Sequence, residues 1–230
     1  MTPPGGCFSN SSTNCSEPGN LCMTSPADRI IGLYSDKADG WIADRGRTLG
    51  RHAPDHLSEA GWFERFMAAL PPGGTVLDVG CGAGWPVAAA LIERGFRVTG
   101  VDPSPGLLAH AAETLPTGEW LAGDMRTLDL GMRRFDGLLA WHSLFHLSPA
   151  DQRIALPRIL SHAAQTCVFM TSSGPNEGEI VGEWRGEPLY HGSLAPGEYR
   201  AVFAAHGFAA DPIDPAEQDQ YGLIWVARRG

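Results

Sequence analysis

An acidic residue followed by a run of glycines gives the first indication of chemistry in this chain. In "TVLDVGCGAGWP", residues 75–86, an apolar run ends at Asp78, and Gly80, Gly82 and Gly84 follow at every second position. Glycine permits positive φ angles and lets a ligand approach the backbone without a Cβ in the way. A glycine loop that enters a helix also presents free N–H groups and the positive end of the helix dipole. We therefore expect this loop to hold a ligand.

The sequence around Asp78 restricts what that ligand is. A phosphate-binding loop requires Lys and then Ser or Thr after its glycines, but Gly84 is followed by Trp85 and Pro86. The dinucleotide fingerprint G-x-G-x-x-G is also missing. A carboxylate repels a pyrophosphate and attracts an ammonium group. A ligand with an amino-acid end, an adenosine end and no phosphate fits these requirements.

The glycine loop lies in a pattern of alternating strands and helices. Three helices are expected first, at 26–34, 36–49 and 56–70. Strands are expected at 75–80, 96–102, 119–124, 135–141, 166–172, 208–213 and 221–228, and further helices at 85–95, 104–114, 149–163 and 196–206. Strands separated by helical crossovers predict an α/β fold, a parallel sheet with helices on both faces. Ligands of such sheets bind beyond the carboxyl ends of the strands, which is where the loop lies.

Composition limits the partners of the protein. The 230 residues include 17 Lys and Arg against 26 Asp and Glu, a net charge of −9, so a nucleic-acid substrate is not expected. No apolar run approaches the roughly 18 residues of a membrane span. Residues 1–25 are rich in Pro, Gly, Ser and Asn and lack the pattern of a secretory signal. We predict a disordered tail there, and a cytoplasmic monomer or homodimer that binds a small molecule and no metal.

Three motifs resemble those of the class I S-adenosylmethionine-dependent methyltransferases. The first is Asp78 with the glycines of the loop, and the second is Asp102 with Pro103 in "VTGVDPS". The third is Asp124-Met125 in "LAGDMRTLDL". The resemblance implies that Asp102 accepts hydrogen bonds from the ribose hydroxyls of S-adenosylmethionine, and that Asp124 and Met125 contact its adenine.

The family also implies an architecture. It predicts a Rossmann-like seven-stranded sheet of order 3-2-1-4-5-7-6, with the last strand antiparallel and helices on both faces. One methyltransferase domain would span 26–230. Within it we expect a helical cap at 26–70, the core at 71–230, and a segment at 174–195 that covers the substrate. The absence of a helix between the last two strands agrees with a final hairpin.

The cap contains further candidates for cofactor binding. "LYSDKADGWIADRGRTLGRH" matches a pattern common in small methyltransferases. By that resemblance Tyr34 reaches the amino-acid end of the cofactor, and Arg45 or Arg47 pairs with its carboxylate. Trp41 closes the pocket over the sulfonium, because an aromatic face attracts positive charge.

Methyl transfer requires the acceptor to be held in line with the methyl group, and some acceptors also need a general base. The fourth strand ends in Trp141, expected at the cofactor, and His142, expected beside the methyl donor. His142 and His191 are the predicted catalytic residues. The predicted substrate-binding residues are His146, Trp184 and Tyr190.

The sequence therefore predicts transfer of a methyl group from S-adenosylmethionine to O, N or C of a small organic acceptor, leaving S-adenosylhomocysteine. The aromatic residues suggest an apolar or aromatic acceptor, as in secondary metabolism. The alternative is a protein that binds S-adenosylmethionine without methyl transfer, as a sensor, partner subunit or cyclase. An NAD-dependent oxidoreductase conflicts with Asp78, and an arsenic methyltransferase conflicts with the single cysteine near the loop, Cys81.

Overall fold

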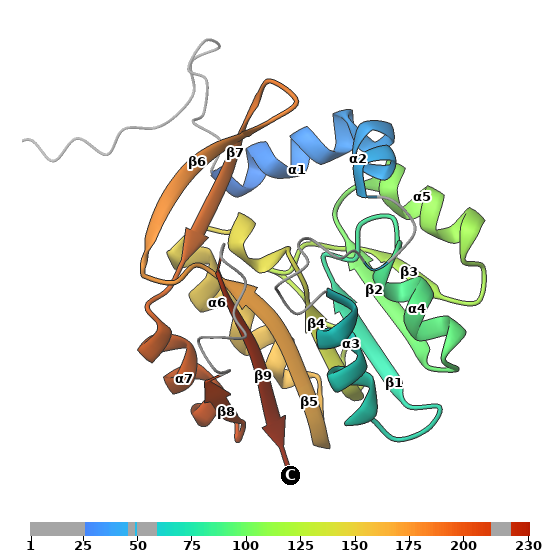
Figure 1. Cartoon of the computed structure of the whole chain (residues 1–230), viewed down its shortest axis with the longest axis vertical. Helices are drawn as coiled ribbons and strands as arrows, with labels where there is room; N and C mark the ends of the chain where they lie inside the picture. Colours follow the sequence, from blue (N-terminus) through green and yellow to red (C-terminus); the bar gives the residue numbers. More distant parts are fainter. Residues whose placement is uncertain (1–25, 46–48, 50–58, 213–221) are drawn as a thin grey trace, which may run out of the picture.

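A computed structural model describes residues 26–45, 49, 59–212 and 222–230 (Figure 1). The predicted disordered tail at 1–25 lies outside the described residues, as do parts of the helices expected at 36–49 and 56–70.

Seven strands form one sheet in the described part of the chain. They are β1 (Thr75–Val79), β2 (Arg97–Asp102), β3 (Glu119–Ala122), β4 (Phe135–Ala140), β5 (Ala163–Ser173), β8 (Ala209–Pro212) and β9 (Leu223–Arg229). Their order is β3-β2-β1-β4-β5-β9-β8, and β9 runs antiparallel to both of its neighbours. β6 and β7 form a separate hairpin. Without those two strands the order is the predicted 3-2-1-4-5-7-6, so the predicted fold is confirmed.

The helices begin largely where the sequence predicts. They are α1 (Pro26–Asp36), α2 (Ala38–Arg45), α3 (Glu59–Ala68), α4 (Val87–Glu93), α5 (Pro105–Thr114), the 3-10 helix η1 (Leu144–His146), α6 (Pro149–Ser161) and α7 (Pro196–Ala205). Ser148 caps α6, because its hydroxyl accepts a hydrogen bond from the Asp151 N–H. The prediction that this helix reaches residue 163 was wrong. Ala163 instead starts β5, where it pairs with Phe135 of β4.

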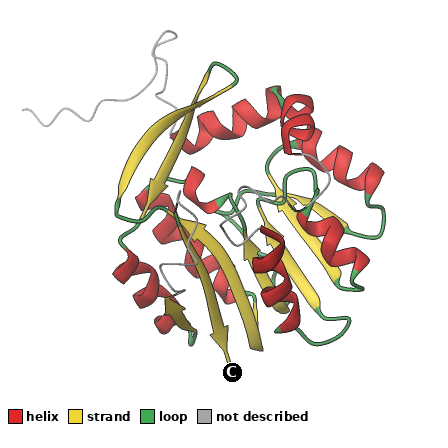
Figure 2. Cartoon of the chain, in the orientation of Figure 1, coloured by secondary structure: helices red, strands yellow, loops and turns green. Residues whose placement is uncertain are grey.

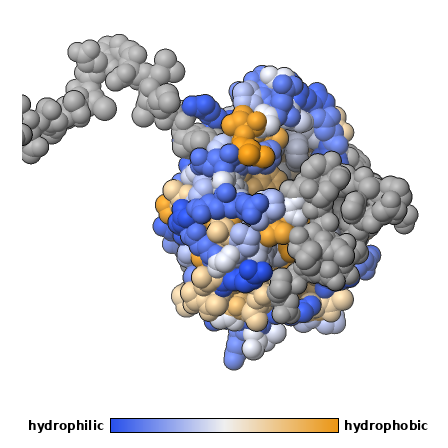
Figure 3. Space-filling model, turned by 60° about the vertical axis from the view of Figure 1, so that its left-hand side comes forward, coloured by the Kyte–Doolittle hydropathy of each residue, from blue (hydrophilic) through white to orange (hydrophobic). Residues whose placement is uncertain are grey.

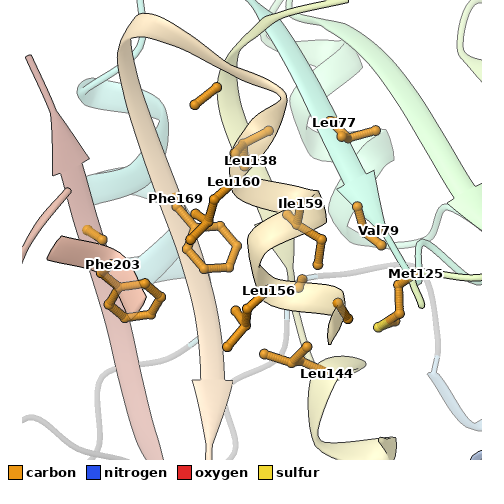
Figure 4. Close-up of a cluster of buried hydrophobic side chains, with 14 of the residues drawn as sticks. Leu77, Val79, Met125, Leu138, Leu144, Leu156, Ile159, Leu160, Phe169 and Phe203 are labelled. Carbon is orange, nitrogen blue, oxygen red and sulfur yellow. The ribbon is translucent and has the colours of Figure 1, made fainter. Parts of the chain in front are cut away.

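Alternate residues of the central strands face two different layers of helices. Leu77 and Val79 of β1 share a core cluster with residues of α6 and α7, whereas Val76 shares one with residues of α3 and α4. Figure 4 shows the first layer, in which Leu156, Ile159 and Leu160 of α6 lie against strand residues such as Phe169. The chain thus has helices on both faces of the sheet (Figure 2).

The cap helices α1 and α2 and the hairpin lie beyond one end of the sheet (Figure 1), whereas α3 of the predicted cap packs on the face of the sheet. β6 (Gly178–Trp184) and β7 (Glu187–Ser193) form the hairpin within the predicted 174–195 segment. α1 packs against β7, α5 and η1, and α2 packs against α5, so cap and hairpin enclose the same space (Figure 1). On the face shown in Figure 3, apolar areas are small and separated by hydrophilic surface. Two exposed apolar residues, Ile180 and Val181, lie on β6.

Candidate active site

A cavity opens beyond the carboxyl ends of β1, β2 and β4, beneath α1 and α2. Its empty volume is about 670 Å³ including the open mouth, a size typical of small-molecule sites. Ten of the predicted site residues line it: Tyr34, Trp41, Gly80, Gly82, Asp102, Pro103, Asp124, Met125, His142 and His146. The other predicted site residues are not among the lining residues: Arg45, Asp78, Gly84, Trp141, Trp184, Tyr190 and His191. Arg47 lies outside the described residues.

All three glycines of the loop adopt positive φ, but they do not serve the same purpose. A Cβ on Gly80 (φ +76°) would lie 2.3 Å from the Cβ of Ser143, so this glycine allows the loop to pack against the segment after β4. A Cβ on Gly84 (φ +76°) would lie 3.0 Å from the ring of Trp120. Both positions therefore require glycine for contacts within the protein.

Gly80 and Gly82 both line the cavity, but only at Gly82 would an added Cβ point at other lining side chains with space to spare. A Cβ there (φ +55°) would point at Trp41 Nε1, 3.5 Å away, and at Leu107, and both of these residues line the cavity. The Gly82 N–H donates to Asp102 Oδ2 over 2.9 Å. The loop therefore leaves backbone bare at Gly82 and holds the Asp102 carboxylate beside it.

Asp102 is held at the end of β2 by two backbone donors. The second is the N–H of Ser104, which donates to Oδ1 over 2.9 Å. Burial raises the pKa of Asp102, although these two hydrogen bonds favour its ionised form. Because a carboxylate has about four acceptor positions, both oxygens can still accept a hydrogen bond from a ligand.

Asp78 lies at the end of β1, 2% exposed and behind the cavity lining. Burial, with the negative charge of Asp102, raises the pKa of Asp78 to about 7, while the positive charge of Arg45 opposes this rise. Arg45, which the sequence predicts to pair with a ligand carboxylate, thus also lies within electrostatic range of Asp78.

Asp124 binds a neighbour that the sequence did not point to. Both of its carboxylate oxygens accept hydrogen bonds from the guanidinium of Arg126, at 2.6 to 3.1 Å. Arg126 also donates to Asp28 of α1 over 2.8 Å. Arg126 therefore links the cap to the loop after β3, and Asp124 meets any ligand with its charge already paired.

Tyr34 and His146 meet at the cavity wall. The Tyr34 hydroxyl lies 3.0 Å from His146 Nε2, and His146 Nδ1 lies 3.0 Å from the Tyr190 carbonyl oxygen of β7. Burial lowers the pKa of His146 to about 3, so the ring is neutral. Burial, together with the nearby charge of Asp102, also raises the pKa of Tyr34 well above its usual value.

His142 has an unusual backbone conformation immediately after β4. Its φ is +49°, a left-handed conformation that is uncommon for residues other than glycine and that costs about 1 kcal/mol or more. Its ring stacks on Trp141 with centroids 4.6 Å apart, and Trp141 in turn packs edge-on against Phe63 in the core. Trp141 thus supports the ring of His142, which itself lines the cavity.

The hairpin residues contact the cavity wall from behind. Trp184 packs against Tyr34 and Trp41, and its Nε1 donates to Asp44 of α2 over 2.9 Å. The Tyr190 hydroxyl donates to Glu179, across the hairpin.

The His191 ring lies 5.0 Å from Phe145 and 5.2 Å from His146, between centroids. Burial lowers the pKa of His191. Its Nδ1 is buried and has no hydrogen-bond partner among the described residues.

Sequence reasoning missed part of the lining. The missed residues are Ile30, Ile31, Ser104, Leu107, Ser143 and Leu147. Ile30 and Ile31 lie four and three residues before Tyr34, a helical spacing that could have indicated a shared face. Ser143 gave no comparable signal, because its position depends on packing against Gly80.

Two other kinds of site are absent from the described residues. No group of three His, Cys, Asp or Glu side chains there could hold a metal ion. No helix in the same part of the chain is long and apolar enough to cross a membrane.

The sheet order and the glycine loop are those of the class I methyltransferase fold. Residues 76–165 match the family model of the methyltransferase domain. The match covers less than half of the chain, and the sheet order around it is that of the class I methyltransferase fold.

Named relatives agree with this class. A putative methyltransferase of Bacillus subtilis, YqeM, is 33% identical over 81 residues, 34% of this chain and 32% of that protein. The malonyl-[acyl-carrier protein] O-methyltransferase of Serratia marcescens is 38% identical over 145 residues, 61% of this chain and 56% of that protein. The matched segments thus span about a third to just over half of these relatives.

A solved structure resembles nearly the whole chain. The 1,6-didemethyltoxoflavin-N1-methyltransferase of Burkholderia thailandensis shares 25% identity and a TM-score of 0.62, over 92% of this chain and 93% of that one. Its structure contains 1,6-didemethyltoxoflavin and S-adenosylhomocysteine.

Proposed function

We propose that this protein transfers a methyl group from S-adenosylmethionine to a small organic acceptor. The observation that carries the proposal is the bare backbone at Gly82 beside the buried Asp102 carboxylate, in a cavity lined by Tyr34 and Trp41. A Cβ at Gly82 would point into that cavity, so the residues fit a ligand lying against the loop. When bound, the cofactor supplies an electrophilic methyl group.

Different residues around the cavity bind different parts of S-adenosylmethionine. Asp102 accepts hydrogen bonds from the ribose hydroxyls, with Pro103 beside it. Met125 supplies an apolar contact for the adenine, and Asp124 accepts from its amino group while Arg126 balances the charge. The negative charges of Asp78 and Asp102 favour an ammonium group.

The acceptor side lies along the rings of His142, Phe145 and His191. Successive centroids are 5.9 Å and 5.0 Å apart, leading from the cavity lining toward the hairpin. Burial lowers the pKa of His191, so it is neutral at pH 7 and can accept a proton from an O–H or N–H acceptor. His142, which lines the cavity, then holds the acceptor near the methyl group, and the surrounding elements exclude water.

The lining favours an uncharged, flat acceptor. Most of its side chains are apolar or aromatic, two serines and two acids add polar groups, and the described lining residues include no Lys or Arg. The relative from Burkholderia thailandensis acts on 1,6-didemethyltoxoflavin and the relative from Serratia marcescens on malonyl-[acyl-carrier protein]. The first of these types of acceptor suits this lining better, since an aromatic wall packs well against a ring.

Titration calorimetry with S-adenosylmethionine and S-adenosylhomocysteine tests the cofactor site. We expect micromolar binding that Asp102→Ala weakens at least tenfold, whereas Asp129→Ala, an exposed acid outside the cavity, leaves it unchanged. Absence of binding by either ligand would overturn the proposal.

An acceptor screen then distinguishes methyl transfer from binding alone. We expect His142→Ala and His191→Ala to lower turnover while retaining affinity for S-adenosylhomocysteine, with His206→Ala as the control. Cofactor binding without turnover of any acceptor would favour the alternative of a sensor, partner subunit or cyclase.

A further inference from the structure

The hydrogen-bond chain from Tyr34 to Tyr190 has a direction that its chemistry fixes. A carbonyl oxygen can only accept, so the contact between His146 Nδ1 and the Tyr190 carbonyl requires a proton on Nδ1. Because the buried ring is neutral, Nε2 then carries a lone pair. Tyr34, 3.0 Å away, must donate its hydroxyl proton to Nε2.

That direction determines what Tyr34 offers to the cavity. Because its only hydroxyl proton is donated to His146, the Tyr34 oxygen has only lone pairs left for contact with a ligand. The phenol also keeps its proton, because burial and the charge of Asp102 oppose ionisation and raise its pKa. Tyr34 lines the cavity together with Trp41, whose ring centroid is 5.0 Å from its own. Lone pairs and aromatic faces both attract positive charge.

We propose that His146 is a positioning residue that fixes the Tyr34 hydroxyl with its lone pairs toward the cavity, so that the site favours the sulfonium of S-adenosylmethionine over the neutral thioether of S-adenosylhomocysteine. This inference rests on the proposed function. It gives His146 a role that is distinct from contact with the acceptor. The hydrogen-bond chain ends at the Tyr190 carbonyl of β7, so the preference for S-adenosylmethionine also depends on the position of the hairpin.

The two ligands provide a sensitive test, because they share the adenosine and amino-acid ends and differ in charge at sulfur. Calorimetry gives the ratio of their dissociation constants for the wild type and four variants. Tyr34→Phe removes the oxygen. His146→Asn retains an N–H that can donate to the Tyr190 carbonyl but is too short to accept from Tyr34. The double variant tests coupling, and His206→Phe is the control, because His206 Nδ1 also contacts a backbone carbonyl, that of Val202, outside the cavity.

We expect Tyr34→Phe and His146→Asn each to lower the preference for S-adenosylmethionine about tenfold, the size of a hydrogen-bond-strength contact to a charged group. The double variant should lower it no further than Tyr34→Phe does, and His206→Phe should leave it unchanged. Affinity for S-adenosylhomocysteine serves as the folding check. An unchanged ratio in His146→Asn, with that affinity intact, would overturn the inference and leave the cofactor site standing. If neither ligand binds the wild type, it is the proposed function that fails.

Discussion

The carboxyl groups of Asp78 and Asp102, at the ends of the adjacent strands β1 and β2, are both buried and interact with each other. The charge of Asp102 adds to burial in raising the pKa of Asp78 to about 7. Two acids held this way destabilise the ligand-free protein when both are ionised, and they attract a cation. The two buried carboxylates therefore lower the stability of the ligand-free protein and strengthen the binding of a cation.

Replacing Asp78 with Asn should stabilise the ligand-free protein at neutral and alkaline pH. The folded-state pKa of Asp78, about 7, exceeds the unfolded value of 3.8, so its contribution to stability is present below pH 4 and is lost as the pH rises toward 7. We expect the free energy of unfolding at pH 8 to increase by about 2–4 kcal/mol, and little change at pH 4. Denaturant titrations of both proteins at the two pH values measure this. Equal differences at both pH values would show that Asp78 does not titrate as described.

Binding of S-adenosylmethionine should strengthen as the pH rises toward and past 7. Below that pH Asp78 holds a proton in the free protein, and an ammonium group favours the ionised carboxylate, so binding must release the proton. We expect the affinity to rise up to tenfold per pH unit between pH 5.5 and 7, and to level off above it. Calorimetry in two buffers of different ionisation enthalpy counts the protons released. In Asp78→Asn this slope should disappear, and its persistence there would assign the proton to another group.

The contact between α2 and the hairpin should control access to the cavity. Asp44 accepts from Trp184 Nε1 and from both Nε and Nη2 of Arg185, each within 2.9 Å. We expect Asp44→Ala to weaken binding of S-adenosylhomocysteine about three- to tenfold, because cap and hairpin lose one of their connections. Hydrogen exchange should rise in α2, β6 and β7.

Because the pair of Asp44 and Arg185 is exposed, salt screens it, and high salt should also weaken binding of S-adenosylhomocysteine to the wild type. A matched control is Glu64→Ala, which breaks the exposed ion pair with Arg94 far from the hairpin. If both variants change binding equally, the contact at Asp44 has no special role.

Substitution of two neighbouring glycines should separate folding from binding. Gly80→Ala places a Cβ 2.3 Å from that of Ser143 at φ +76°, and we expect a loss of about 3 kcal/mol in stability. At Gly82 the φ angle is also positive, but an added Cβ has space. Gly82→Ala should therefore lower the free energy of unfolding by only about 1 kcal/mol, yet reduce ligand affinity at least tenfold.

Gly95→Ala is the control for these two variants, since its φ is +85° and no atom lies within 4 Å of an added Cβ. Thermal unfolding and calorimetry on all three variants provide the comparison. A large loss of stability in Gly82→Ala would contradict the assignment of that glycine to the ligand.

The order of the elements and most of their bounds followed from local signals. Ser148 and Pro149 mark the start of α6, and a short apolar run marks β1, because capping and local hydrophobicity are properties of short segments. The end of α6 did not follow, since pairing of Ala163 with Phe135 involves a distant strand.

The sequence by itself determined the fold class and the acidic and glycine residues at the strand ends, because parallel strands bring their carboxyl ends to one edge. The tertiary structure alone decided how those residues are used. It separated Gly82, which faces the cavity, from Gly80, which packs on Ser143, and it paired Asp124 with Arg126. It also joined Tyr34, His146 and the Tyr190 carbonyl by consecutive hydrogen bonds. Such contacts span up to 112 residues, and only packing in three dimensions sets the distances and burial on which their chemistry depends.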